Sequence, residues 1–210
     1  MEISPLTLNR LSLYLRCLRS LEDDGVERIS SLELAQRFHL SAAQIRKDLA
    51  QFGEFGIRGV GYEVGALIER LTRLLGLERF HPLIIVGMGN LGSALAASVG
   101  FNSGSFQVVA GVDNDPEKIG SRVADVLIED ARDMAAVVRR TEAEIGVLTV
   151  PAAAAQSNYD GLVDAGVRAV LNFAPTRLKL APGVRSKDVD LRIDLEEMGY
   201  FLTRSKRPVR

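Results

Sequence analysis

Residues 84–92 read Ile84-Ile85-Val86-Gly87-Met88-Gly89-Asn90-Leu91-Gly92, and this stretch decides the fold of the chain. It is predicted to form a buried strand that runs into a G-x-G-x-x-G turn, after which a helix begins. A second apolar run follows at residues 106–112, and Asp113 stands directly after it, 21 residues beyond Gly92. Strand, glycine turn, helix, strand and acid in this order are typical of a dinucleotide site.

Each part of this motif has a physical role toward a dinucleotide. Gly87 permits the tight turn, Gly89 lets the backbone approach a pyrophosphate, and Gly92 allows close contact between helix and strand. The helix N-terminus offers unpaired N–H groups and the positive end of its dipole to the phosphates. Asp113 is expected to accept hydrogen bonds from the adenosine ribose and to repel a 2′-phosphate. The motif therefore favours NAD(H) over NADP(H), and the alternative is a glycine-rich turn in an α/β domain without a ligand.

Strands and helices are predicted to alternate after residue 82, which indicates a parallel sheet with right-handed crossovers. The predicted strands are 83–87, 106–112, 125–128, 145–150 and 168–171, and the predicted helices are 91–98, 131–139 and 152–165. Two loops should meet the glycine turn at the carboxyl ends of the strands. These loops contain Thr149-Val150-Pro151 and Asn172-Phe173-Ala174-Pro175, in which Phe173 either flanks the nicotinamide or caps the core.

The first eighty residues do not resemble part of a dehydrogenase. Helices are predicted at 6–22, at 32–38 with Ser30 and Glu33 as a capping box, from Ser41 with Gln44 at the reciprocal position, and at 64–75. A glycine-rich β-hairpin is predicted at 52–62, and residues 77–82 are predicted to be a linker that Pro82 ends. Two short helices followed by a hairpin are typical of a winged helix-turn-helix.

The second helix of that motif carries candidate DNA-binding residues. These are Gln44, Arg46 and Lys47 on the helix and Arg58 on the hairpin. In such modules the second helix enters the major groove and the basic residues around it bind phosphates. Asp48 next to Lys47 weakens the electrostatic argument, and the alternative is a solvated helical face in a small packing domain.

Composition limits the class of protein. The chain has 210 residues, with 26 Lys and Arg against 27 Asp and Glu, so that any basic surface must be local. The single cysteine, Cys17, excludes an internal disulfide framework and fits a reducing cytoplasm. No apolar run approaches the ~20 residues that a membrane span needs, and residues 1–5 lack the basic start and the apolar stretch that are typical of a signal peptide. We expect a soluble, cytoplasmic protein with no membrane contact.

No obvious proton donor for hydride transfer accompanies the nucleotide motif. Residues 82–210 contain neither histidine nor cysteine, and little length remains for a substrate domain. A dinucleotide site without a catalytic group, joined to a DNA-binding module, favours a sensor that reads the cofactor. The alternatives are an NAD-dependent oxidoreductase with a helical extension and a structural subunit that binds CoA or a nucleotide.

At this point the chain resembles the Rex family of redox-sensing transcriptional repressors over nearly its whole length. The resemblance rests on seven segments, which are Gln44-Ile45-Arg46-Lys47-Asp48-Leu49, Phe52 to Tyr62, Val86 to Leu95, Val112-Asp113, Asp115 to Gly120, Leu148 to Pro151 and Leu171 to Pro175. It implies a repressor without enzymatic activity that binds a palindromic operator when NADH is scarce and leaves it when NADH binds. It also implies that NAD⁺ competes with NADH without releasing the DNA, and it implies no metal.

The resemblance also implies an architecture and a set of site residues. The α/β fold would combine a winged-helix domain at 1–80, a Rossmann domain at 81–190 and a C-terminal helix at 191–210 that is exchanged within a homodimer. The apolar stripe at 191–204 fits such a helix. The implied cofactor-binding residues are Gly87, Met88, Gly89, Asn90, Leu91, Gly92, Asp113, Lys118, Val150, Pro151, Asn172, Phe173 and Ala174.

One implied element departs from the family pattern. Family members couple the cofactor to DNA through an arginine on the first helix, a tyrosine after the glycine-loop helix and an aspartate of the partner subunit. Arg16 and Asp190 match the two charged positions, whereas Ser98 stands where the tyrosine is expected. A paralogue that binds NAD(H) and DNA with weak redox switching is therefore a further alternative.

Overall fold

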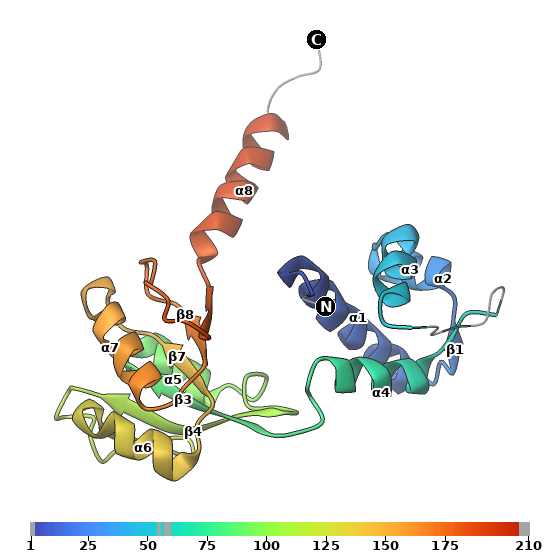
Figure 1. Cartoon of the computed structure of the whole chain (residues 1–210). Coiled ribbons are helices and arrows are strands. Elements are labelled where there is room, and N and C mark those ends of the chain that lie inside the picture. The colour runs from blue at the N-terminus through green and yellow to red at the C-terminus, as the bar shows by residue number, and fades with distance from the viewer. Residues whose placement is uncertain (1–2, 54–55, 57–59, 206–210) are drawn as a thin grey trace. The chain divides into compact units, whose positions relative to one another are not determined.

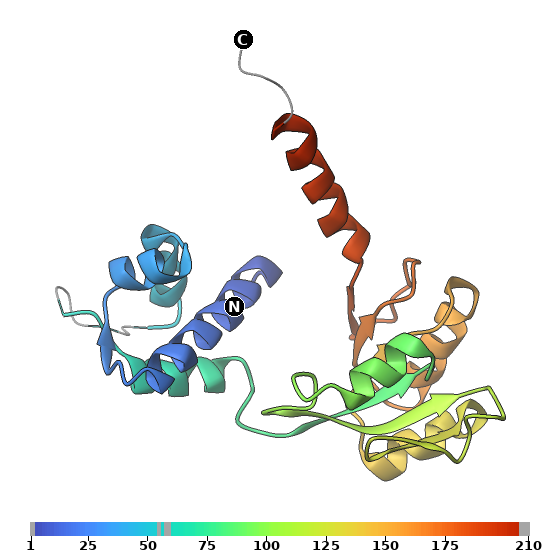
Figure 2. The ribbon, with the colours of Figure 1, turned by 180° about the vertical axis from the view of Figure 1, so that it is seen from behind.

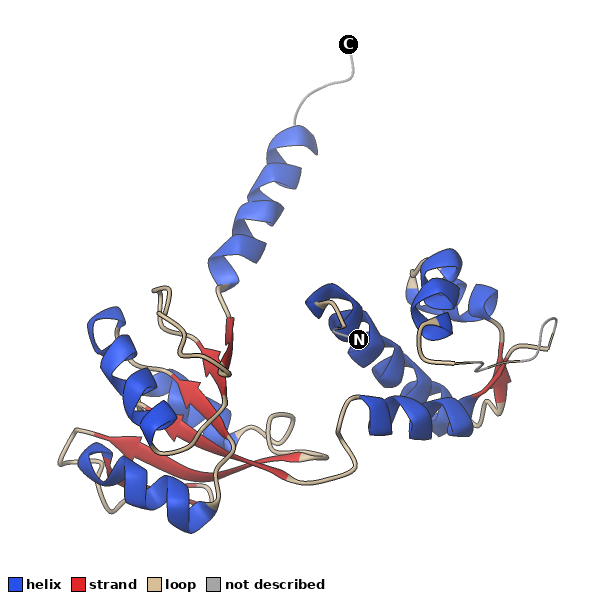
Figure 3. Ribbon diagram, in the orientation of Figure 1, coloured by secondary structure: helices blue, strands red, loops and turns tan. Residues whose placement is uncertain are grey.

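The structure is a computed structural model of the whole chain, and it describes residues 3–53, 56 and 60–205. The chain divides into two compact units, Met1–Arg79 and Phe80–Arg210. Figure 3 shows that the described strands are concentrated in the second unit and that the first is mainly helical. Each unit has its own apolar core, and each is described by itself below.

The N-terminal unit is a small helical bundle with a two-stranded sheet. Its elements are α1 (Pro5–Asp23), β1 (Arg28–Ile29), α2 (Ser31–Phe38), α3 (Ala42–Ala50), β2 (Tyr62–Glu63) and α4 (Val64–Leu74). Figure 1 shows α1 lying along α4, with α2 and α3 next to each other. The helices bury one apolar stripe each, as the spacing in the sequence predicts.

Local capping defines where the short helices begin. The Ser30 hydroxyl accepts the Glu33 N–H at 3.1 Å, and the Glu33 carboxylate accepts the Ser30 N–H at 2.8 Å, which completes the predicted capping box. The Ser41 hydroxyl likewise accepts the Gln44 N–H at 3.3 Å. The predicted reciprocal bond from Gln44 is absent, because its carboxamide instead donates to Asp48 at 2.8 Å.

The predicted hairpin at 52–62 is only partly covered by the described residues. Among them, Tyr62 alone belongs to a strand, and it pairs with Ile29 in an antiparallel ladder between β1 and β2. The partner of β2 is therefore the segment before α2, which the alternation of residues 52–62 did not predict. Arg58 lies outside the described residues.

The C-terminal unit contains a seven-stranded sheet with the order β5-β6-β4-β3-β7-β8-β9. Its strands are β3 (His81–Val86), β4 (Phe106–Asp113), β5 (Arg122–Val123), β6 (Val126–Asp130), β7 (Ile145–Leu148), β8 (Ala169–Asn172) and β9 (Arg185–Asp188). All pairs are parallel except β5 with β6. The six parallel strands have the order of a doubly wound dinucleotide-binding sheet, with the switch point between β3 and β7.

Helices cover both faces of this sheet, as Figures 1 and 2 show from opposite sides. The covering elements are α5 (Asn90–Ala97), the 3-10 turn η1 (Ala131–Asp133), α6 (Met134–Thr141) and α7 (Ala152–Asp164). A further helix, α8 (Leu191–Ser205), follows β9 and covers neither face. Ile84 and Val86 of β3 face the core under α6 and α7, whereas Leu83 and Ile85 face the core under α5. This alternation explains the continuous apolar run, because a central parallel strand is buried on both faces.

Two predictions about this unit need correction, and two of its strands were missed. Pro82 does not end a linker, because it is buried within the central strand β3, where its carbonyl accepts the Glu144 N–H at 2.9 Å. The short strand β5 and the polar edge strand β9 were not predicted, since neither is an apolar run. The helix predicted at 131–139 begins instead with the 3-10 turn at 131–133.

The helix α8 buries none of its apolar residues in this chain. Every residue of α8 whose side chain is described is exposed, including Leu195, Met198 and Phe201. Across the described residues, the structure contains no helix with the length and apolar character of a membrane span.

Candidate functional site

The glycine turn after β3 is held in shape by bonds from two other strands. Gly87 has a φ of +96°, in the left-handed region that favours glycine. The Thr149 hydroxyl at the end of β7 lies 2.6 Å from the Gly87 carbonyl oxygen and 3.2 Å from that of Val86. A Cβ built at Gly92 would overlap the Gly87 carbonyl oxygen, so only glycine allows the turn and α5 to pack this closely.

Gly89 differs from the other two glycines of the motif. A Cβ built at Gly89 meets no atom within 4 Å, and the residue lies outside the positive φ region. Gly89 is the N-cap of α5 and makes no side-chain cap, so the N–H groups of the first turn are available to a ligand. The space beside Gly89 is therefore where an anionic group can approach the backbone.

Asp113 links the second strand to the glycine turn. It is 7% exposed, and its carboxylate accepts the Met88 N–H at 2.7 Å and the Asp115 N–H at 2.9 Å. Met88 thus contributes its backbone, while its side chain is buried against Gly111, where a Cβ would crowd its sulfur. The acid at the end of β4 therefore fixes the turn and also faces the adjacent cavity.

Lys118 brings a positive charge to the same place. Its Nζ lies 3.2 Å from an oxygen of Asp115 and 3.5 Å from an oxygen of Asp113. The bond to Asp115, followed by the charge of Asp113, raises the pKa of Lys118. The backbone N–H of Glu117, followed by Lys118, lowers the pKa of Asp115. The group as a whole carries two acids and one base.

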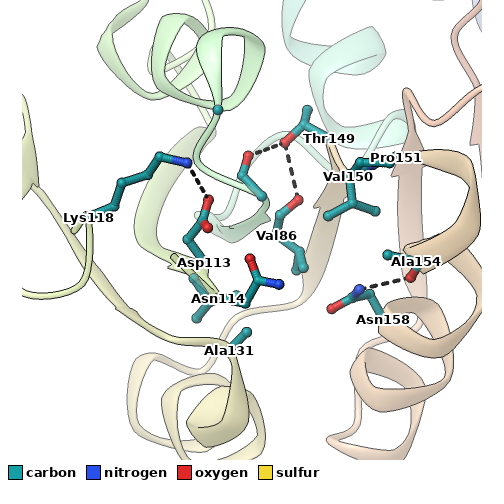
Figure 4. Close-up of a pocket in the computed structure, with 13 residues that line it drawn as sticks. Val86, Asp113, Asn114, Lys118, Ala131, Thr149, Val150, Pro151, Ala154 and Asn158 are labelled. Carbon is teal, nitrogen blue, oxygen red and sulfur yellow. Dashed lines mark hydrogen bonds and ion pairs between the residues drawn. The ribbon is translucent and has the colours of Figure 1, made fainter. Parts of the chain in front are cut away.

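A cavity of about 320 Å³ opens between the glycine turn and the segments after β4, β6 and β7. Figure 4 shows Lys118 and Asp113 on one side of it and Val150, Pro151 and Asn158 on the other. Its lining residues are Val86, Gly87, Gly89, Val112, Asp113, Asn114, Lys118, Ala131, Thr149, Val150, Pro151, Ala154 and Asn158. The cavity lies at the carboxyl ends of β3, β4 and β7, at the switch point of the sheet.

The structure brings together six of the predicted cofactor residues, Gly87, Gly89, Asp113, Lys118, Val150 and Pro151. Met88, Asn90, Leu91 and Gly92 belong to the turn and the first turn of α5 but do not line the cavity. Asn114, Ala131, Thr149, Ala154 and Asn158 line it and were not among the predicted site residues. No sequence motif points to Asn158, because it lies in the second turn of α7 and reaches the cavity only through the packing of that helix.

The loop after β8 is separate from this cavity lining. Asn172 is fully buried, and its side-chain Nδ2 donates to the Thr176 carbonyl oxygen at 3.0 Å and to the Asp188 carboxylate at 2.8 Å. Its side-chain Oδ1 accepts the Ala174 N–H. Phe173 is half-buried and packs against the core under α5. The hydrogen bonds of Asn172 tie the loop after β8 to Asp188 of β9, at the carboxyl edge of the sheet.

Three of the four candidate DNA-binding residues, Gln44, Arg46 and Lys47, lie on α3. Arg46 and Lys47 are exposed, and Arg46 donates to the Ser31 hydroxyl at the start of α2 at 2.8 Å. Gln44 is half-buried, since its carboxamide donates to Asp48. These three residues lie on the first two turns of the second helix of the helix-turn-helix pair.

Asp48 is not a surface charge beside Lys47, which removes the electrostatic objection to a basic α3. It is fully buried, and its carboxylate accepts Arg10 Nε and Nη2 at 2.5 and 2.8 Å, the Tyr14 hydroxyl at 2.9 Å and Gln44 Nε2 at 2.8 Å. The bonds from Arg10 outweigh burial and lower the pKa of Asp48. Burial, together with the bond to Asp48, raises the pKa of Tyr14 to about 12.

No group of three or more potential metal ligands gathers within the described residues. Of the two histidines, His81 pairs with Glu144 at the opening of β3, and His39 ends α2 in a left-handed conformation. Neither histidine lines the cavity.

Known proteins match this chain over both units. Residues 2–50 match the family model described as putative DNA-binding protein N-terminus, and residues 80–176 match that of the CoA binding domain. The redox-sensing transcriptional repressor Rex of Syntrophomonas wolfei is 45% identical over 206 residues, which cover 98% of each chain. The Rex repressor of Chloroflexus aggregans is 42% identical over 200 residues, covering 95% of this chain and 94% of the relative.

Solved structures match the same span. RSP in complex with β-NAD⁺ and operator DNA superimposes with a TM-score of 0.92 and 36% identity, over 98% of this chain and 95% of that one. RSP in complex with β-NADH gives a TM-score of 0.88 and 35% identity, over 98% and 97%. RSP is described as a Rex-family repressor.

Proposed function

The chain belongs to the Rex family of redox-sensing transcriptional repressors, and we propose that NADH releases it from a palindromic operator that it otherwise binds. The observation that carries the proposal is the cavity between Gly89, Asp113 and Pro151. The same chain contains a helix-turn-helix whose second helix exposes Arg46 and Lys47. A relative bound to NAD⁺ and operator DNA and the same relative bound to NADH support both halves of the proposal.

The cavity accounts for the half of the cofactor that NADH and NAD⁺ share. The first turn of α5 would bind the pyrophosphate, and Asp113 would bind the adenosine ribose. Asn114 after β4, Ala131 in η1 and Asn158 in α7 would line the space for the adenine. A ligand shifts an equilibrium only by its difference in affinity for the two states. NADH and NAD⁺ must therefore be distinguished near Pro151 and Phe173, at the nicotinamide end.

We propose that the chain acts as a homodimer whose C-terminal helix is exchanged between subunits. An exposed stripe of Leu191, Leu195, Met198 and Leu202 along α8 supports this, because such residues at helical spacing favour burial against a partner. Within the proposed organisation, residues 1–80 bind DNA, residues 81–190 bind the cofactor and residues 191–210 join the subunits.

The Met198→Asp variant tests the dimer. We expect it to sediment as a monomer and to lose operator binding, because a charge on the stripe opposes burial and a palindrome needs two half-sites. Glu197→Gln, next to it in sequence, is the control and should stay dimeric. A dimeric Met198→Asp protein would contradict an interface built on this stripe.

The switch residues remain a proposal as well. Arg16 is exposed on α1, Asp190 is exposed before α8, and Ser98 is half-buried at the C-cap of α5. We propose that they link cofactor binding to DNA release and that Ser98 makes the link weaker than a tyrosine would. The Ser98→Tyr variant should then show a larger ratio of operator affinities without and with NADH, and an unchanged ratio would refute this role.

The Lys47→Ala variant tests the DNA-binding surface. We expect weaker binding to all DNA sequences and a salt dependence whose logarithmic slope falls by about 1, because one phosphate contact is lost. NADH affinity should be unchanged, which isothermal titration can check. A salt slope equal to that of the wild type would show that Lys47 contacts no phosphate.

Operator binding measured at fixed salt against NADH, NAD⁺ and NADPH tests the proposed function itself. We expect NADH to dissociate the complex, NAD⁺ to compete with NADH without dissociating it, and NADPH to act only at higher concentration. The paralogue with weak switching predicts the same binding with little dissociation. Residues 80–176 match the family model of the CoA binding domain, and binding of CoA in preference to NADH would instead favour a CoA-binding subunit.

A further inference from the structure

The carboxamide of Gln44 can adopt only one orientation in this structure. Gln44 lies in the first turn of α3, and its Nε2 lies 2.8 Å from Oδ1 of the buried Asp48. A carboxylate only accepts hydrogen bonds, so the amide nitrogen, and not the amide oxygen, must face it. Arg10 and Tyr14 donate to the same carboxylate and hold it in place from α1.

This orientation leaves a defined pair of groups for a ligand. Nε2 has two N–H groups, of which Asp48 takes one, so one donor and the acceptor Oε1 remain. Among the contacts of the described residues, Oε1 of Gln44 has no hydrogen-bond partner. One donor beside one acceptor matches the major-groove edge of adenine, which presents N7 as acceptor and N6–H as donor. Guanine presents two acceptors there, N7 and O6, and matches it poorly.

We propose that Asp48 is a positioning residue that orients Gln44 to read an adenine in each half of the operator. The inference rests on the proposed function, because it assigns the base that the DNA-binding unit recognises. The N-terminal residues of a recognition helix are the ones that contact base edges, and Gln44 is the third residue of α3. The exposed Arg46 and Lys47 then supply phosphate contacts, which position the helix without reading the sequence.

The buried cluster of Asp48, Arg10 and Tyr14 explains why Gln44 would select adenine over guanine. A free glutamine can rotate its amide by half a turn and offer its second N–H in place of Oε1, which would suit guanine. The ionised Asp48 opposes that rotation because it would place Oε1 against a carboxylate oxygen. The charge of Asp48 is itself held by Arg10, whose side chain is 32% exposed.

The experiment begins with selection of bound sequences from a randomised palindromic duplex pool by the full-length wild-type protein. Each symmetric position of the selected operator is then changed to the other bases, and affinities are measured at fixed salt. We expect one position at which guanine in place of adenine weakens binding about tenfold or more. Gln44→Ala should remove the preference at that position alone, and Asp48→Asn should reduce it severalfold.

Tyr14→Phe is the matched control, because it removes a donor from the same carboxylate and leaves the bond to Gln44. Its preference should equal that of the wild type. If Gln44→Ala keeps the wild-type preference at every position, or if a folded Asp48→Asn protein keeps it in full, the inference is wrong. Should Asp48→Asn not fold, the Gln44→Ala result alone decides. Absence of any selected operator for the wild type would instead refute the proposed function.

Discussion

The Gly89→Ala variant is expected to lose at least about tenfold in NADH affinity while the chain stays folded. A methyl group at Gly89 meets no protein atom within 4 Å, so the free protein accommodates it. The stability change should stay within about 1 kcal/mol, which is the difference between glycine and alanine at an N-cap. The methyl group would occupy the space through which the pyrophosphate reaches the backbone of α5. Isothermal titration and thermal unfolding measure the two quantities.

Gly92→Ala is the matched control. It should chiefly lower stability, whereas Gly89→Ala should chiefly lower NADH affinity. A Cβ there would overlap the Gly87 carbonyl oxygen and lie 2.9 Å from the Thr149 hydroxyl. We expect clear destabilisation of the C-terminal unit, because backbone atoms cannot move aside as a flexible side chain can. Equal NADH affinity of Gly89→Ala and the wild type would show that the cofactor does not bind at this turn.

The Asp48→Ala variant is expected to destabilise the N-terminal unit by about 3 kcal/mol. The change removes the acceptor of four hydrogen bonds and leaves the buried Tyr14 hydroxyl and part of the Arg10 guanidinium without a partner. Breaking a buried ion pair costs about 3–5 kcal/mol, and the partial exposure of Arg10 puts this loss at the lower end. Operator binding should fall with the fraction folded, whereas NADH binding by the C-terminal unit should persist. Denaturant unfolding followed separately in each unit checks this.

The Asp48 carboxylate also makes the stability of the N-terminal unit depend on pH in the acid range. Asp48 has a lowered pKa in the folded chain, chiefly through the bonds from Arg10. Its contribution is therefore complete above the unfolded value of about 3.9 and is lost as the pH falls through the folded value. The wild type should lose stability over that acid range more steeply than Asp48→Ala. Parallel curves for the two proteins would contradict this role of Asp48.

Short-range patterns made much of the fold predictable from the sequence. The G-x-G-x-x-G turn predicted the strand before it and the helix after it, and the structure confirms β3 and α5 there. Ser30 and Glu33 predicted the start of α2 because a capping box spans only three residues. Gly87, Gly89 and Asp113 were placed together since parallel strands bring their carboxyl ends to one edge.

Contacts between residues far apart in the chain could not be predicted from the sequence. Asp48 looked like an exposed acid beside Lys47, and its burial depends on Arg10 and Tyr14, more than thirty positions away. Asn158 enters the cavity only because α7 packs over the sheet at that register. The edge strand β9, Arg185–Asp188, lacks the alternation of apolar and polar residues that marks a strand in a sequence. Only its pairing with β8 in the structure identifies it as a strand.

The central claim is that the protein exists in two states in equilibrium, one favoured by operator DNA and the other by NADH. Binding linkage then requires that operator DNA weaken NADH binding by the same factor by which NADH weakens operator binding. The most direct measurement is the NADH affinity of the wild type with and without saturating operator duplex, at one salt concentration. We expect the operator to lower NADH affinity severalfold or more and to leave NAD⁺ affinity nearly unchanged. An NADH affinity that is the same with and without operator would contradict the claim.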